Sequence, residues 1–522
     1  MTTTAATATE PGATLAPLPR QIPYIIATEG CERFSFYGMR NILTPFLVST
    51  LLLYLPIEDR AGAARDVFHT FVIGVYFFPL LGGWISDRLW GKYNTVLWLS
   101  MVYVAGHACL AAFEDNRTGF YTGLFLIALG SGGIKPLVSA FVGDQFDSSN
   151  KHRARLVYDA FYWMINFGSF FASLLMPIFL RSFGPAVAFG IPGALMAVAL
   201  WVFWLGRKRY VRVPPSPPNP DSLLRVARTA LLSRGRGKSR PGLWVAIAGA
   251  IVALAALGTI PLLGFVIGAC LALGALLAFG GIGTSMQLER ARGIHPDEAV
   301  DGVRGVLRLM IVFALVTPFW SLFDQKASTW VLQGAEMAKP AWFHEAQMQA
   351  LNPLLVLLLI PFNNLVLFPL MRRIGIMPTA LRRMGAGIAF SALAWVAAGF
   401  IQLAIDGGDP VFIAWQVLPY ALLTLGEVLV SATGLEFAYS QAPPSMKGSI
   451  MSFWMLSVTF GNLWVLLADA GIRNDAITDW IASTGFGENA FLMFFFAAFA
   501  ALAALVFALY ARRYPMQDFY RT

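Results

Sequence analysis

The most informative segment of the chain is Glu29-Gly30-Cys31-Glu32-Arg33-Phe34-Ser35-Phe36-Tyr37-Gly38-Met39-Arg40, which sets two carboxylates and two guanidinium groups in an apolar region. On a helix that turns about 100° per residue, its polar side chains fall within roughly 140° of one another. These are Glu29, Glu32, Arg33, Tyr37 and Arg40. Charges at membrane depth are costly and mark pathways for substrates or ions. The segment therefore predicts a first transmembrane helix with one face on such a pathway.

The composition is that of an integral membrane protein. The chain has 522 residues, of which 57% are hydrophobic and 13% are charged, and its mean hydropathy is +0.63. Soluble domains are nearer to about 25% charged. Apolar runs of about 20 residues recur along the chain, whereas a β-barrel would show alternating segments of about 10 residues. The sequence therefore predicts an all-α, multi-pass protein in a lipid bilayer.

The apolar runs predict about fourteen transmembrane helices in two groups of six and one extra pair. A strongly basic, Pro-rich connection separates the first six from the pair. We expect the following units: 1–20 disordered cytoplasmic tail, 21–206 first six-helix bundle, 207–242 basic cytoplasmic linker, 243–283 additional hairpin, 284–302 cytoplasmic linker, 303–512 second six-helix bundle and 513–522 cytoplasmic tail. Because the hairpin has almost no polar side chains, we expect it to lie against lipid, outside the pathway.

The distribution of charge predicts the orientation. The chain has a formal net charge of +9, and its cations cluster in alternate loops, as in the linker 207–242. Loops of the other set carry acidic residues such as Glu58, Asp59 and Asp409. By the positive-inside rule both termini lie in the cytoplasm. This pattern explains the positive charge better than nucleic-acid binding does.

The sequence indicates neither a metal site nor catalytic chemistry. Cys31, Cys109 and Cys270 lie in apolar spans without metal-ligand spacing, so we expect free thiols that serve in packing. The first twenty residues lack the basic start and apolar core of a signal peptide. A phosphate-binding motif of the G-x-x-x-x-G-K-[ST] type is absent from the sequence, which argues against ATP-driven pumping. We expect no catalytic residue, no metal and no cofactor.

An ordered series of motifs resembles the proton-dependent oligopeptide transporter family of the major facilitator superfamily. The family's first-helix signature, E-x-x-E-R, is matched at residues 29–33. Residues 82–88 resemble the superfamily's loop motif, and 130–136 and 161–168 resemble the family patterns of helices four and five. Further matches are Phe68-His69-Thr70-Phe71-Val72, Tyr76, Pro79, Trp320, Asp324, Asn352, Gly426-Glu427, Ser431 and Gly434-Leu435-Glu436.

The resemblance implies a major facilitator fold that works by alternating access. It implies proton-coupled symport of di- and tripeptides into the cytoplasm, with protons as the coupling ion and a monomeric protein in the cell inner membrane. Two alternatives stay open. One is a related symporter for another small anion or zwitterion, such as nitrate or a modified amino acid, and the other is a membrane nutrient sensor.

The chemistry of a peptide accounts for several of these residues. A peptide is a zwitterion, so binding it away from water requires cations for its carboxylate and an anion for its ammonium. Arg40 and Lys135 supply cations in the first half, and Glu427 supplies an anion in the second. The resemblance implies that Asn166 and Asn352 hydrogen-bond the peptide. We also expect Tyr37, Tyr76, Trp320, Ser431 and Trp454 to line the site, although these aromatic side chains could instead only pack helices together.

Proton coupling requires groups whose charge can change during transport. Glu29 and Glu32 beside Arg33 are candidates, because burial favours a protonated carboxyl and a neighbouring arginine favours the charged form. The resemblance implies that Asp324 is a proton site that pairs with a first-helix arginine. His69 matches a histidine of part of the family, and a position at the rim of its span is the alternative.

We expect charge pairs between the two halves to act as gates. The candidate pairs are Arg33 or Arg40 with Asp324, and Lys135 with Glu427. Such pairs can hold one side closed and separate when a proton or a peptide terminus competes for a partner. Because each charged group exchanges one partner for another, no buried charge is left without a partner.

Overall fold

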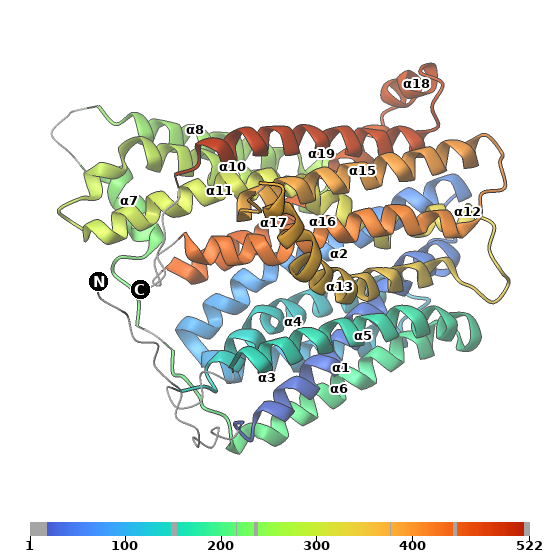
Figure 1. Ribbon diagram of the computed structural model, residues 1–522, viewed down its shortest axis with the longest axis horizontal. Coiled ribbons are helices and arrows are strands. Elements are labelled where there is room, and N and C mark those ends of the chain that lie inside the picture. Colours follow the sequence, from blue (N-terminus) through green and yellow to red (C-terminus); the bar gives the residue numbers. More distant parts are fainter. Residues whose placement is uncertain are drawn as a thin grey trace.

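The computed structural model describes residues 18–147, 154–215, 217–233, 239–375, 377–441 and 446–515. Within these ranges the regular elements are helices and no strand forms, which confirms the all-α prediction. The tails predicted at 1–20 and 513–522 lie outside the described residues, apart from 18–20 and 513–515. The start of α1 (Ile22–Phe46) and the end of α19 (Glu488–Arg513), next to the two termini in sequence, lie on the same side of the molecule, at the left of Figure 1.

Among the described residues, fourteen helices are candidates to cross a membrane. Twelve stretches meet a simple criterion of length and hydropathy, and the first of them, Ile57–Ala112, joins two consecutive helices. The first helix of the chain falls outside this criterion because its polar face lowers its hydropathy. With that helix added and the joined stretch divided, the count is fourteen, as predicted.

The first bundle contains six of these helices, and the first continues as a π-helical turn, Leu47–Leu51. The helices are α1 (Ile22–Phe46), α2 (Ile57–Ile85), α3 (Gly91–Ala112), α4 (Arg117–Gly143), α5 (Ala154–Phe183) and α6 (Pro185–Leu205). Pro23 lies in the first turn of α1, where its missing N–H breaks no helical hydrogen bond. Asn116 caps α4 by accepting a 2.9 Å hydrogen bond from the Gly119 N–H. Helix α1 packs between α5 and α6.

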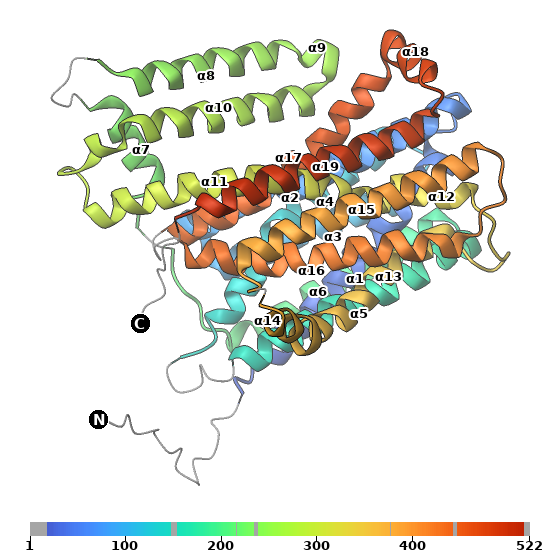
Figure 2. The same ribbon diagram turned by 45° about the horizontal axis from the view of Figure 1, so that its top comes forward.

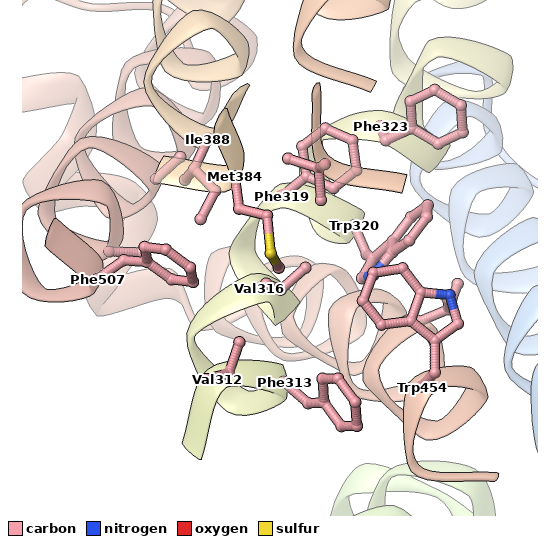
Figure 3. Close-up of a cluster of buried hydrophobic side chains, with 14 of the residues drawn as sticks. Val312, Phe313, Val316, Phe319, Trp320, Phe323, Met384, Ile388, Trp454 and Phe507 are labelled. Carbon is pink, nitrogen blue, oxygen red and sulfur yellow. The ribbon is translucent and has the colours of Figure 1, made fainter. Parts of the chain in front are cut away.

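The second bundle repeats this plan with shorter accessory helices (Figure 1). Its elements are α11 (Asp297–Asp324), α12 (Thr329–Glu336), α13 (Leu351–Phe362), α14 (Phe368–Arg373), α15 (Ala380–Asp406), α16 (Val417–Ser440), α17 (Lys447–Ile472), α18 (Asp475–Ser483) and α19 (Glu488–Arg513). Its core is continuous and apolar. Figure 3 shows part of this core, in which Phe313 packs against Trp454 and Phe319 packs against Trp320.

The extra pair of helices lies at the edge of the molecule, as Figure 2 shows. Helices α8 (Pro241–Gly258) and α10 (Phe265–Gln287) pack on each other, and the short helix α9 (Ile260–Leu263) joins them. Helix α10 contacts α17 through a small apolar cluster that includes Ile267, Cys270 and Leu466. Most of the hairpin's large side chains are exposed on the protein, which agrees with the predicted contact with lipid.

The basic connection contains a helix that the sequence reading did not identify, α7 (Leu223–Leu232). Its residues Val226 and Ala230 are fully buried against the start of α11. Next to it, the His295 ring lies 2.7 Å from Asp221 Oδ1 and 2.9 Å from Thr229 Oγ1. The connection is therefore fixed on the second bundle by side-chain contacts.

The two bundles meet mainly through α2 with α17 and α5 with α13. Within the first bundle, α2 packs against α4, and the two backbones come into close contact. A methyl group built on Gly82 would lie 2.5 Å from the Gly133 Cα. Glycine is required there, because no real side chain tolerates that distance.

Replacement of Gly82 by valine should push α2 away from α4. Overpacking of this kind costs about 1–3 kcal/mol, so the thermal unfolding midpoint of the purified protein in detergent should fall. The control is Gly83→Val, because a methyl group on Gly83 meets no atom within 4 Å. Equal midpoints for the two variants would contradict this description of the α2–α4 contact.

Candidate functional site

Helix α1 holds two buried carboxylates around one guanidinium. Arg33 Nε donates a 2.7 Å hydrogen bond to Glu29 Oε1 and lies 2.8 Å from Glu32 Oε2. All three side chains are at most 9% exposed. Nε carries a single hydrogen, which it donates to Glu29. With both carboxyls ionised the cluster would have one surplus negative charge, which a single proton removes.

A second polar network joins the two bundles. Arg40 Nη2 on α1 lies 2.5 Å from Asp324 Oδ1 at the end of α11, and both side chains are at most 6% exposed. The other oxygen of Asp324 accepts a 2.8 Å hydrogen bond from Asn462 Nδ2 on α17. The predicted pair of a first-helix arginine with Asp324 is therefore formed, and Arg40 is the arginine.

His69 is the next member of this network. Its Nδ1 lies 2.6 Å from Asn462 Oδ1 and its Nε2 lies 2.9 Å from Ser328 Oγ. The side chain is fully buried, so the alternative of a rim position is wrong. His69 is on α2, whereas Asn462 and Ser328 belong to the second bundle. The imidazole thus bridges the bundles, three hydrogen bonds away from the Arg40 guanidinium through Asn462 and Asp324.

A third network contains the anion predicted for the peptide ammonium. Asn352 Nδ2 donates a 2.5 Å hydrogen bond to Glu427 Oε2 and lies 3.1 Å from Thr424 Oγ1. The Asn352 amide oxygen in turn accepts a 2.9 Å hydrogen bond from Lys326 Nζ. This lysine is 5% exposed and lies 3.2 Å from the centre of the Phe323 ring. One asparagine therefore links a buried cation to a half-buried anion.

The predicted gate between Lys135 and Glu427 is not formed. Lys135 on α4 lies over two aromatic rings, 3.4 Å from the centre of Phe36 and 5.0 Å from that of Tyr76. Glu427 is instead linked to Lys326 through Asn352. The physical reason is proximity: Lys326 belongs to the same bundle as Glu427, whereas Lys135 stays over rings of its own bundle.

The predicted aromatic residues divide into two groups. Tyr37 and Tyr76 are partly exposed and lie beside the first-bundle charges. Trp320 and Trp454 are only 7% and 6% exposed, and their ring centres are 5.9 Å apart (Figure 3). Their large faces are therefore covered mainly by the core of the second bundle, which agrees with the packing alternative.

Asn166 and Ser431 lie on α5 and α16, apart from the hydrogen-bonded charged networks of the described residues. Asn166 on α5 donates a 3.0 Å hydrogen bond to the carbonyl of Tyr162, within its own helix. Ser431 follows Glu427 by four residues on α16, which sets both on one face of that helix. Hydrogen bonds and ion pairs among the described residues do not connect either side chain to the charged networks.

Sequence reasoning missed several residues of these networks, of which Lys326 and Asn462 are central. Lys326 follows Asp324 by two residues, so a lysine at the end of an apolar span was the available signal. No sequence pattern marks Asn462, because the role of a single amide in an apolar span depends on which residues lie near it in the folded protein. Two further missed pairs join α2 to the end of α17: Arg65 Nε lies 3.2 Å from Asp469 Oδ1, and Asp66 is bonded to Arg473.

Contacts between the bundles continue at the end of the molecule opposite the termini. Thr44 Oγ1 donates to the carbonyl of Ala327 at 2.9 Å, and Gln349 Nε2 donates to that of Asn41 at 3.2 Å. Thr44 and Ala327 lie beyond Arg40 and Asp324 in sequence, and Gln349 lies in the 3-10 helix Glu345–Ala350. The molecule is therefore closed at that end.

Two six-helix bundles with buried, exchangeable charges at their interface define a class of protein, the secondary transporters. The family model described as "POT family" matches residues 93–468. The chain belongs to this family.

Solved structures support the assignment. The chain is 66% identical to a structure described as an auto-inhibited POT family peptide transporter, with a TM-score of 0.95 and coverage of 97% of this chain and 99% of that one. It is also 66% identical to the POT family transporter PepTSo, with the same TM-score and coverage of 96% and 99%.

The chain is also similar to two animal proteins, at lower sequence identity. Human solute carrier family 15 member 1 is 29% identical over 489 residues, which cover 88% of this chain and 62% of that protein. Rabbit solute carrier family 15 member 2 is 32% identical over 434 residues, which cover 80% and 53%. The chain thus spans little more than half the length of these relatives.

Because Arg40 and Asp324 form a buried pair, the effect of replacing one on the free energy of unfolding should depend on whether the other is present. Arg40→Met leaves a buried carboxylate without its cation and should destabilise the protein by about 3–5 kcal/mol. The double variant with Asp324→Leu should recover much of this loss, because it removes both charges. Unfolding of all four proteins in detergent gives the coupling energy as a double-mutant cycle.

The control for this cycle is Asp297→Asn, since Asp297 is 76% exposed in its contact with Arg292. Its loss should cost less than about 1 kcal/mol. Additive effects of the two buried substitutions would show that Arg40 and Asp324 do not interact energetically.

Proposed function

We propose that the protein imports di- and tripeptides together with protons by alternating access. The observation that supports this most is the presence of cations and an anion in linked networks at the interface of the two bundles. Arg40, Lys135 and Lys326 supply the positive charge and Glu427 supplies the negative charge. A zwitterionic peptide presents the complementary charges.

In this proposal the peptide replaces contacts within the protein. Its carboxylate is taken by the cations around Arg40 and Lys135, and its ammonium is taken by Glu427. Glu427 is held by Asn352, which also binds Lys326, so an arriving ammonium competes with a neighbouring cation. Every buried charge keeps a partner during the exchange, which avoids the high cost of an unpaired one. Asn166, Ser431 and the half-buried Tyr37 and Tyr76 complete the proposed site.

The coupling proton is carried by carboxyl groups in the first two networks. Glu32 is the candidate in α1, because its carboxyl is buried beside Arg33 while the Nε hydrogen of Arg33 is donated to Glu29. Asp324 is the candidate at the interface. Protonation of Asp324 removes the charge that attracts Arg40, which weakens a contact between the bundles and frees the guanidinium for a peptide carboxylate.

The orientation follows from the loop charges. We place both termini in the cytoplasm and the closed end towards the periplasm, in a cell inner membrane, so the structure corresponds to the state closed to the outside. The protein acts as a monomer, without a cofactor and without covalent change to the peptide. Glu427 favours a zwitterion over nitrate as the cargo, because an inorganic anion has no group for that glutamate.

Reconstituted vesicles test the proposal. Labelled dialanine should accumulate when an inward proton gradient is imposed, and a protonophore should abolish the accumulation. Unlabelled tripeptide should compete, whereas nitrate should not. Binding of dialanine without accumulation would indicate the sensor, and competition by nitrate but not by peptides would indicate an anion carrier.

Removal of the charge of Glu427 should affect peptides according to their amino end. A charged hydrogen bond contributes about 1.5–3 kcal/mol, so Glu427→Gln should weaken binding of dialanine by roughly 10- to 100-fold. Binding of N-acetyl-dialanine should change little. Competition in the vesicle assay measures both, with Glu488→Gln as an exposed control. Equal losses for both peptides would rule out the ammonium role.

Neutral replacements of the candidate proton carriers should abolish the coupling of peptide transport to protons but not the conformational change that carries the peptide across the membrane. Glu32→Gln and Asp324→Asn should abolish gradient-driven accumulation but retain exchange of labelled for unlabelled dialanine, because exchange needs no net proton transfer. Asp409→Asn, at an exposed position, should behave like the parent protein. Proton-driven accumulation by both variants would show that other groups carry the proton.

A further inference from the structure

A cavity lies between the extra hairpin and the contact of the two bundles, outside the peptide site. Its volume is about 520 Å³, within the range of about 300–1,000 Å³ typical of ligand pockets. Its walls come from three places: α2, the end of α17, and the hairpin turn from α9 into α10. The hairpin turn lies at the end of the molecule opposite the termini (Figure 2).

The cavity is polar at its outer end. Arg473 follows the last residue of α17, and its side chain is 60% exposed while bonded to Asp66, which is 27% exposed. Both residues line the cavity, as does Asn474. The neighbouring charges, Arg65 and Asp469, neutralise each other at 3.2 Å. The polar end therefore presents one cation and one anion to a ligand.

Asp66 also has unused capacity for hydrogen bonds. Its Oδ1 is buried and receives no hydrogen bond from the described residues, whereas its Oδ2 is bonded to Arg473 and, as a carboxylate oxygen, can accept a second hydrogen bond. Arg473 donates one further hydrogen bond, from Nε to the carbonyl of Asp469. A guanidinium has five N–H groups, so it can also bind a phosphate. Asp66 thus offers an acceptor to a donor cation, and Arg473 offers donors to an anion.

The cavity is apolar towards the middle of the membrane. Thr70 lies one turn deeper than Asp66 on α2, and the remaining walls are apolar side chains that include Leu263, Phe265, Ile267 and Leu466. Because Arg473 lies just beyond α17 and Phe265 begins α10, the polar end is at the membrane boundary. The cavity is thus shaped for an amphiphile with its head at the boundary and its chain towards the interior.

We propose that this cavity binds a phospholipid with an ethanolamine headgroup. The lipid phosphate contacts Arg473, the ammonium donates to Asp66, and an acyl chain lies between the hairpin and α17. A choline headgroup carries the same charges but has no N–H to donate to Asp66. A glycerol headgroup leaves Asp66 without a cation. The site therefore selects ethanolamine among the common headgroups.

The position gives the extra hairpin a role. A lipid in this cavity touches the hairpin, α2 of the first bundle and α17 of the second at once. It therefore stabilises the closed arrangement in which Arg65 is paired with Asp469. This inference goes beyond peptide transport and does not depend on it.

The experiment is native mass spectrometry of the full-length protein from detergent, with three lipids of identical acyl chains added in turn. These carry ethanolamine, choline and glycerol headgroups. The ethanolamine lipid should be retained roughly tenfold more strongly than the choline lipid, the factor that one charge-assisted hydrogen bond supplies. Equal retention of the ethanolamine and choline lipids would overturn the proposal.

Two variants assign any preference to this cavity. Asp66→Asn removes the acceptor charge and should reduce ethanolamine retention to the choline level. Ala470→Phe fills the cavity without a change of charge, since Ala470 lines it, and should have the same effect. Ala501→Phe, in an apolar groove between α15 and α19, and Asp479→Asn, at an exposed site, should keep the preference. An ethanolamine preference that survives Ala470→Phe would place the lipid elsewhere and overturn the proposal.

Discussion

The structure depends on one buried contact between oppositely charged side chains of its two halves, Arg40 on α1 and Asp324 on α11. Among the described residues, the ion pair that each of these side chains forms is with the other, so separation of the bundles would take this partner away from both charges. The cost of such a charge in a low-dielectric interior is several kcal/mol. The ionic contact therefore does more than add stability: it makes the relative position of the bundles depend on protonation and on competing ligands.

The neighbouring polar residues extend this contact. Asn462 bonds to Asp324 and to His69, so one amide connects an acid of the second bundle with an imidazole of the first. These directional bonds add to the helix packing of α2 with α17 and of α5 with α13. The same principle holds for Glu427, which Asn352 holds beside Lys326. In both networks a side-chain amide forms hydrogen bonds that link two other polar groups. A substrate or a proton can replace one of these bonds.

Much of the fold could be predicted from the sequence because the membrane imposes simple rules. Apolar runs of the required length define the helices, and the polar residues at 29–40 have a helical period that specifies a single face. The identity of each partner could not be predicted in the same way. Charge and location in opposite halves predict a pair of Lys135 with Glu427, yet Asn352 links Glu427 to Lys326, which follows α11 in the same bundle.

The errors have a common physical cause. Periodicity shows which side of a helix a residue is on, but not how deep it lies or which helix it faces. His69 could be read as a rim residue because its depth was unknown, and Asn462 carried no pattern at all. Trp320 and Trp454 were identified by position, but only the packed core shows that their faces are largely covered. Residues whose role depends on a partner distant in sequence require the structure.

The central claim is that the contact of Arg40 with Asp324 helps to hold the end opposite the termini closed. Pulsed electron paramagnetic resonance tests it directly, with spin labels at the exposed positions Thr118→Cys and Asp409→Cys, and with Cys31, Cys109 and Cys270 replaced by alanine. The parent protein should give mainly one short distance between the labels, and Arg40→Met should shift the population towards a longer one. A distance distribution that Arg40→Met leaves unchanged would contradict the account.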